Sequence, residues 1–190
     1  MTANAAQPHQ PVAPGPPRPG GAVVIGIGNP ILSDDGIGWR VAEQVEVALR
    51  ARGDARAGER VQVRRMCLGG LALAEALVGY ERAVLIDAIL TGSARPGTVY
   101  RFGIADLPAT LNTASSHDMT LAGALAMLRR LGAPLPPDDC IRVIAVEAED
   151  VWTFGEACTP RVTRSVARAA QAVLDELAAW PAEQMASADL

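Results

Sequence analysis

The chain has 190 residues, of which 49% are hydrophobic and 20% are charged, and its formal net charge is −4. This length and composition suit one compact globular domain with a full core. The sequence shows no basic stripe, which argues against nucleic acid as a partner. No apolar stretch reaches the roughly 20 residues that cross a bilayer, so no membrane partner is expected.

Residues 1–20 contain six of the fourteen prolines and almost nothing that a core could bury. Such a segment cannot offset its ordering entropy, so we predict a disordered leader in which His9 has no role. A single α/β domain is expected over residues 21–180, followed by a flexible tail over residues 181–190.

Strand-like and helix-like segments alternate after the leader. Residues 22–27 form an apolar run typical of a strand, and apolar residues at helical spacing then predict a helix over 37–49. A second strand is predicted over 60–67 and a short helix over 73–78. Residues 83–87 form a continuous apolar run that ends in an aspartate, which indicates a central strand buried on both faces.

The second half of the chain continues the alternation. We predict a strand over 98–102, a polar loop over 112–116 and a helix over 119–131. A last strand over 141–146 precedes a long C-terminal helix over 162–177. The pattern predicts an α/β fold, with three α/β/α layers around a mostly parallel central sheet of about five strands.

The three cysteines are Cys67, Cys140 and Cys158, an odd number without a Cys-x-x-Cys pair. This favours reduced thiols in a cytoplasmic protein over a disulfide framework. We expect Cys158 to be a buried or half-buried thiol without catalytic use, because a Thr-Pro pair leads directly from it into the last helix. The two histidines, His9 and His117, exclude a zinc site built on several histidines.

The turn after the first strand has the sequence GIGNPILSDDGIG over residues 26–38. Phosphate-binding turns at such places depend on bare backbone N–H groups and the positive end of a helix. Here the turn delivers two adjacent carboxylates, Asp34 and Asp35, and lacks the third glycine of a dinucleotide fingerprint. The charge of the turn therefore favours a cation over an anionic ligand.

Three polar residues are expected to converge at one edge of the sheet. Asp35 follows the first strand, Asp87 ends the third, and His117 leaves a polar loop at the start of a helix. Ligands of open α/β sheets bind beyond the carboxyl ends of the strands. Two carboxylates and one imidazole suit a divalent transition metal, with coordination positions left open as in catalytic sites.

Each of these residues also has a structural alternative. Asp34 or Asp35 can cap the first helix, and we assign this role to Asp34, with Ser33 as a competitor. Asp87 can cap a strand-to-helix turn, although no strong helix follows it. His117 can be a helix-start residue stabilised by its surroundings. The prediction of a site rests on the three residues together.

The sequence resembles the maturation endopeptidases of nickel–iron hydrogenases. The matching segments are VIGIGN (residues 24–29), DDGIG (34–38), LIDA (85–88), PGT (96–98) and SHD (116–118). A weaker similarity continues into the last helix, so the resemblance covers about residues 22–178. Some relatives carry an acidic residue where this chain has Leu68, so no catalytic carboxylate is expected at that position.

The resemblance implies that Asp35, Asp87 and His117 bind metal and perform catalysis. It implies a metal-dependent or aspartic-type endopeptidase, which removes the C-terminal extension of a hydrogenase large-subunit precursor already loaded with nickel. The nickel is presented by the precursor and is not a tightly held prosthetic metal. We expect the protein to be a cytoplasmic monomer.

Two alternative functions use the same residues differently. A non-catalytic nickel-binding accessory protein would need the same three ligands, because binding and cleavage share them. Peptidyl-tRNA hydrolases have a similar start to residues 26–30 and a related sheet. They also need a histidine soon after that start and a basic face, and this chain has neither.

Overall fold

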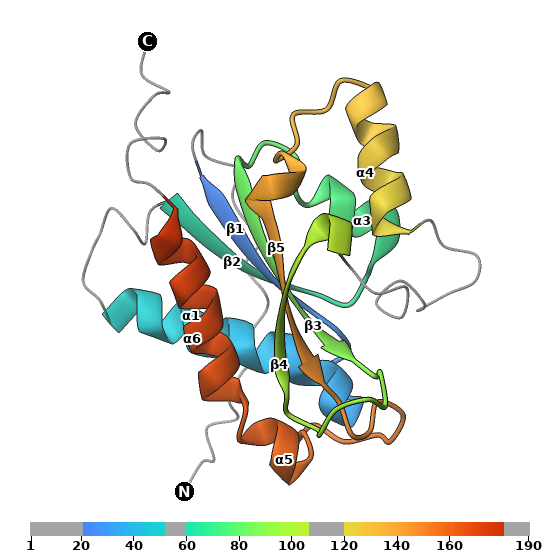
Figure 1. The fold of residues 1–190 in the computed structure, drawn as a ribbon, viewed down its shortest axis with the longest axis vertical. Coiled ribbons are helices and arrows are strands. Elements are labelled where there is room, and N and C mark those ends of the chain that lie inside the picture. Colours follow the sequence, from blue (N-terminus) through green and yellow to red (C-terminus); the bar gives the residue numbers. More distant parts are fainter. Residues whose placement is uncertain (1–20, 52–59, 107–119, 181–190) are drawn as a thin grey trace, which may run out of the picture.

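The computed structural model describes residues 21–51, 60–106 and 120–180 (Figure 1). The predicted leader and tail, the polar loop over 112–116 and His117 lie outside these described residues. The statements made above about them therefore stay predictions.

The described residues form one five-stranded sheet with the strand order β2-β1-β3-β5-β4. Neighbouring strands pair in parallel, except that β4 runs antiparallel to β5 at one edge. The mostly parallel sheet predicted from the sequence is confirmed. The strands are β1 (Ala22–Ile27), β2 (Val61–Met66), β3 (Arg82–Ile89), β4 (Val99–Gly103) and β5 (Ile141–Glu147).

Helices connect these strands, and among the described residues none is long and apolar enough to cross a membrane. The α-helices are α1 (Ile37–Ala51), α3 (Gly70–Glu75), α4 (Leu121–Arg130), α5 (Pro160–Thr163) and α6 (Val166–Ala179). The short 3-10 helices are η1 (Ser33–Gly36), η2 (Ile104–Asp106) and η4 (Asp138–Cys140).

Two helices differ most from their predictions, whereas α1 and α4 depart by no more than two residues at either end. The short helix α3 begins at Gly70 and ends at Glu75, earlier than the predicted range of 73–78. The predicted C-terminal helix is divided into α5 and α6. At the division the Ser165 hydroxyl donates a hydrogen bond of 2.6 Å to the Val162 carbonyl, and its backbone N–H donates to the same oxygen. Such local bonds compete with the regular helical pattern.

The sheet is covered on both faces, as Figure 1 shows: α1 and α6 lie on one side and α3 and α4 on the other. Successive residues of β1 enter opposite cores, because side chains of a strand alternate between its faces. Val24 packs in the core below α1 and α6, whereas Val23 and Ile25 pack in the core below α3 and α4. Burial on both faces explains the continuous apolar runs in the sequence.

Glycines bring the first turn of α1 directly against the sheet. A Cβ atom on Gly26 would lie 2.2 Å from the carbonyl oxygen of Gly38. A Cβ atom on Gly38 would lie 2.2 Å from the Ile27 carbonyl oxygen and 2.6 Å from that of Ile86. These are backbone atoms, which cannot move aside cheaply. Only glycine at both positions permits this approach, which places the turn before α1 over the ends of β1 and β3.

We therefore expect Gly38→Ala to lower the free energy of unfolding by about 3 kcal/mol or more, since the added methyl group overlaps two backbone oxygens. Gly69→Ala is the matched control, because a Cβ atom there would meet nothing within 4 Å. The control should change stability by no more than about 0.5 kcal/mol. Urea unfolding of both variants tests this, and equal midpoints for Gly38→Ala and the wild type would contradict it.

Candidate functional site

Asp35 and Asp87 lie at the carboxyl ends of two adjacent parallel strands. Asp35 is in η1, directly after β1, and Asp87 is near the end of β3. From β1 the chain passes through α1 to β2 on one side, while β3 flanks β1 on the other side. Ligands of open α/β sheets bind at such a change of direction. The structure thus brings two of the three predicted site residues together, and His117 lies outside the described residues.

Asp87 is not the last residue of its strand, in contrast to the prediction from the apolar run. β3 runs two residues further, because Ala88 and Ile89 remain paired with the end of β5. Asp87 is paired with Ala145 of β5, whereas the pairing of β3 with β1 ends one residue earlier at Ile86, so β5 sets the backbone position of Asp87.

The Asp35 carboxylate is held by the glycine-rich turn. The backbone N–H of Asn29 donates a hydrogen bond of 2.6 Å to Asp35 Oδ2. Gly28, with φ of +124°, allows the chain to pass so closely that a Cβ atom there would lie 1.8 Å from the Asp35 carbonyl oxygen. No hydrogen bond within the described part of the chain reaches Asp35 Oδ1.

Asp87 has the most perturbed carboxyl group of this region. Burial raises its pKa to about 7, the Ala88 N–H opposes the rise, and the negative charge of Asp35 adds to it. The Ala88 hydrogen bond is 2.8 Å long and uses Asp87 Oδ1, which leaves Oδ2 without a donor among the described residues. A carboxyl group with a pKa near neutrality can exchange its proton for a cation or act as a general base.

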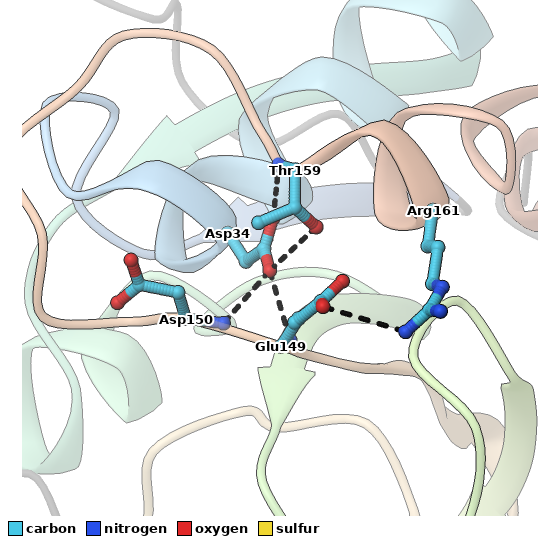
Figure 2. A network of polar contacts seen from close by, with 5 residues as sticks. All are labelled: Asp34, Glu149, Asp150, Thr159 and Arg161. Carbon is cyan, nitrogen blue, oxygen red and sulfur yellow. Dashed lines mark hydrogen bonds and ion pairs between the residues drawn. The ribbon is translucent and has the colours of Figure 1, made fainter.

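Asp34 does not cap the first helix, so that prediction is wrong, and Ser33 does not cap it either. The Asp34 side chain is fully buried and points toward the segment that follows β5 (Figure 2). It accepts hydrogen bonds from the backbone N–H groups of Glu149 (2.8 Å), Asp150 (3.0 Å) and Thr159 (2.7 Å), and from the Thr159 hydroxyl (3.1 Å).

Backbone pairing strengthens the same connection. The N–H of Ser33 donates to the Gly155 carbonyl at 2.8 Å, and the N–H of Gly155 donates to the Ile31 carbonyl at 3.0 Å. Ser33 adopts a φ of 41°, which is uncommon for a residue with a side chain. Backbone hydrogen bonds therefore join the turn after β1 to the segment after β5, and Asp35 lies within the joined turn.

A second buried carboxylate, not predicted from the sequence, belongs to Glu147 at the end of β5, which is 1% exposed. It accepts hydrogen bonds from the N–H of Thr91 (2.8 Å) and Gly92 (3.0 Å) and from the hydroxyls of Thr91 (2.8 Å) and Tyr100 (2.9 Å). Burial, and then the hydrogen bond to Glu147, raise the pKa of Tyr100. The sequence does carry a signal for Glu147, because an acidic residue directly follows the apolar run over residues 141–146.

Four of the acidic residues at this edge, Asp34, Asp35, Asp87 and Glu147, fall into two groups. Asp34 and Glu147 each accept four hydrogen bonds and so are saturated structural acceptors. Asp35 and Asp87 each accept one from the described residues and keep lone pairs for a ligand. Within the described ranges no group of three His, Cys, Asp or Glu residues is placed to hold a metal. His117 as the third ligand thus stays a prediction.

Cys158 is a half-buried thiol, as predicted, and its Sγ donates to the Ser33 carbonyl at 3.6 Å. Burial raises the pKa of this thiol, and the charge of Asp34 raises it further. A thiol that stays protonated is a poor nucleophile. None of the three cysteines forms a disulfide.

We expect Asp34→Asn to lower the free energy of unfolding by about 3 kcal/mol, because the charge-assisted hydrogen bonds weaken and an amide group would face buried N–H donors. Asp138→Asn is the control: Asp138 forms an exposed ion pair with Arg129, so its loss should cost about 1 kcal/mol or less. Urea unfolding is the measurement. Equal losses in the two variants would contradict a structural role specific to Asp34.

The raised pKa of Asp87 predicts a particular pH dependence of stability. The folded protein holds this proton up to about pH 7, whereas the unfolded chain releases it near its ordinary value of 3.8. Its contribution to stability is therefore complete at low pH and is lost as pH rises through about 7. In metal-free buffer, Asp87→Asn should gain stability relative to the wild type as pH rises. A carboxyl titration midpoint near 4, measured by carbon NMR, would contradict this.

Comparisons with known proteins place the chain in a family. The sequence model of the hydrogenase maturation protease family, HycI, matches residues 24–176. The hydrogenase maturating endopeptidase HybD from E. coli is 27% identical, with a TM-score of 0.65 over 83% of this chain and 92% of that one. The solution structure of an endopeptidase from Escherichia coli is 26% identical, with a TM-score of 0.66 over 83% and 91% of the two chains.

A curated relative gives a shorter match. The hydrogenase 2 maturation protease of Escherichia coli (strain K12) is 28% identical over 111 residues, which are 58% of this chain. The matched segment spans 64% of that relative, which is less than two thirds of its length. The family match, in contrast, extends from β1 to α6 and includes both Asp35 and Asp87. The chain belongs to the hydrogenase maturation protease family.

Proposed function

We propose that this chain is a processing endopeptidase that removes the C-terminal extension of a nickel-loaded nickel–iron hydrogenase large-subunit precursor. Membership of the family and the similarity to HybD support hydrolysis of a peptide bond. The observation that carries the proposal is the pair of under-bonded carboxylates, Asp35 and Asp87, at the carboxyl edge of the sheet. The reduced thiols favour a cytoplasmic protein, which we propose acts as a monomer.

The two carboxylates are suited to a metal that arrives with the substrate. Their negative charges repel each other, which contributes to the raised pKa of Asp87. A divalent cation between them would remove this repulsion and displace the Asp87 proton. Oxygen ligands together with the imidazole of His117, which the family motif supplies, form a set that accepts a borderline metal such as nickel.

Bound nickel would supply Lewis-acid chemistry, by polarising the scissile carbonyl or lowering the pKa of a water molecule. Asp35 would orient the precursor through its free oxygen while Asn29 holds the other oxygen in place. In the alternative mechanism Asp87 does not bind the metal and keeps its pKa of about 7, so it would accept the proton of the attacking water and return it to the leaving amine. Metal binding would then serve mainly to recognise the substrate.

A metal requirement of this kind makes cleavage a checkpoint. A precursor without nickel would present no cation to Asp35 and Asp87, so their free oxygens would gain no ligand from it and binding would be disfavoured. Only a precursor that has received its metal would be cut. The order of events, loading before processing, would then follow from electrostatics at the site.

His117→Ala and Asp87→Asn should each slow release of the C-terminal peptide from nickel-loaded precursor by roughly a hundredfold or more, because each removes a proposed ligand or proton acceptor. Mass spectrometry of the incubated precursor measures the release. His9→Ala and Asp138→Asn are matched controls outside the proposed site and should process at the wild-type rate. Full activity of both site variants would refute the mechanism, and an intact precursor with bound wild-type protein would indicate an accessory function.

A further inference from the structure

Arginine side chains from distant parts of the sequence surround one pocket. The turn before β4 and the segment containing α5 and the start of α6 enclose a volume of about 750 Å³. Arg95 comes from the turn, and Arg161, Arg164 and Arg168 come from the helical segment. All four are exposed, on a chain whose net charge is −4. The fold thus brings together four positive charges that are separated in the sequence.

Two of these arginines stabilise the walls, and two do not. Arg161 forms an ion pair of 3.4 Å with Glu149, and Arg168 donates to the Gly97 carbonyl. Arg95 and Arg164 have no ion pair or side-chain hydrogen bond within the described part of the chain. Guanidinium groups at such a place favour carboxylate or phosphate ligands, which they can bind in a bidentate manner.

The shape of the pocket is set by backbone contacts. Gly97 has a φ of +85°, and a Cβ atom there would lie 2.7 Å from the Arg161 carbonyl oxygen. Its N–H donates to the Glu147 carbonyl at 2.7 Å, which connects the turn to the end of β5. Because the wall is held by the sheet, a ligand would not need to order it. The pocket lies at the same edge of the sheet as Asp35 and Asp87.

A segment with two exposed aromatic residues immediately precedes α5. Trp152 and Phe154 are 79% and 80% exposed. The Asp150 carboxylate accepts the N–H groups of Trp152 (2.9 Å) and Thr153 (3.0 Å), and Asp34 holds the segment at Asp150 and Thr159 (Figure 2). Large exposed aromatic side chains mark protein interfaces, and a pre-ordered backbone reduces the entropic cost of binding.

We propose that the arginine pocket and the Trp152–Phe154 segment form the docking surface for an acidic segment of the protein substrate. A small anion would match the arginines but leave both aromatic side chains in water. A protein that offers carboxylates next to apolar side chains would cover both features at once. The identity of the partner rests on the proposed function, whereas the chemistry of the surface follows from the residues themselves.

Binding of nickel-loaded precursor to the full chain, measured by rapid mixing before the C-terminal peptide is released, tests the surface. Arg95→Ala with Arg164→Ala should raise the dissociation constant roughly tenfold and weaken its salt dependence, since two screened ion pairs are lost. Arg50→Ala with Arg130→Ala makes the same charge change elsewhere and should have no effect. Trp152→Ala with Phe154→Ala should weaken binding roughly tenfold as well, and Leu131→Ala, at another exposed apolar residue, should not.

Unchanged affinity and salt dependence in the Arg95 and Arg164 double variant would overturn the proposal. A second result would also overturn it: these arginines bind inorganic phosphate saturably, and the variants bind precursor with wild-type affinity. The pocket would then serve a small anion. If the surface variants lose precursor binding but the wild-type protein releases no C-terminal peptide, the proposed function fails and the docking surface stands. If peptide is released and the variants bind like the controls, the docking surface alone fails.

Discussion

The position of the candidate site depends on the buried carboxylate of Asp34. Its four hydrogen bonds connect the turn after β1 to the segment after β5, although these lie more than 100 residues apart in the sequence. A fully buried carboxylate is tolerated because donors surround it. Asp35 is the next residue in the chain, so the hydrogen bonds that hold Asp34 also determine where Asp35 lies over the sheet. The aromatic segment and the start of α5 are held by the same contacts.

Saturation with hydrogen bonds separates structural acids from site acids in this fold. Asp34 and Glu147 use their oxygens to hold loops at the carboxyl edge of the sheet. Asp35 and Asp87 keep free lone pairs in each other's neighbourhood, which is unfavourable without a cation or a proton. Burial raises the pKa of Asp87 to about 7, and the negative charge of Asp35 adds to this rise. The hydrogen bonds of Asp34 and Glu147 stabilise the loops, and this stability offsets the unfavourable proximity of Asp35 and Asp87.

Sequence patterns predicted the layers well and the roles of single polar residues less well. All five strands were expected, and the three central ones (β1, β3 and β5) have long apolar runs because they are buried on both faces. The division between α5 and α6 was not expected, since it depends on the conformation of one serine. Asp87 and Glu147 end similar apolar runs, yet one belongs to the candidate site and the other is a structural acceptor. Local sequence does not contain the hydrogen-bond donors that distinguish them.

Local spacing and residue type are enough to predict the alternation of strands and helices, the glycine-rich turn and the candidate pair Asp35 and Asp87. The connection that Asp34 makes between two distant loops, in place of a helix cap, emerges only in the folded protein. The same is true of the pocket at which Arg95 joins three arginines of the α5–α6 segment. Both outcomes require contacts between residues far apart in the chain, and such contacts exist only once the sheet has formed.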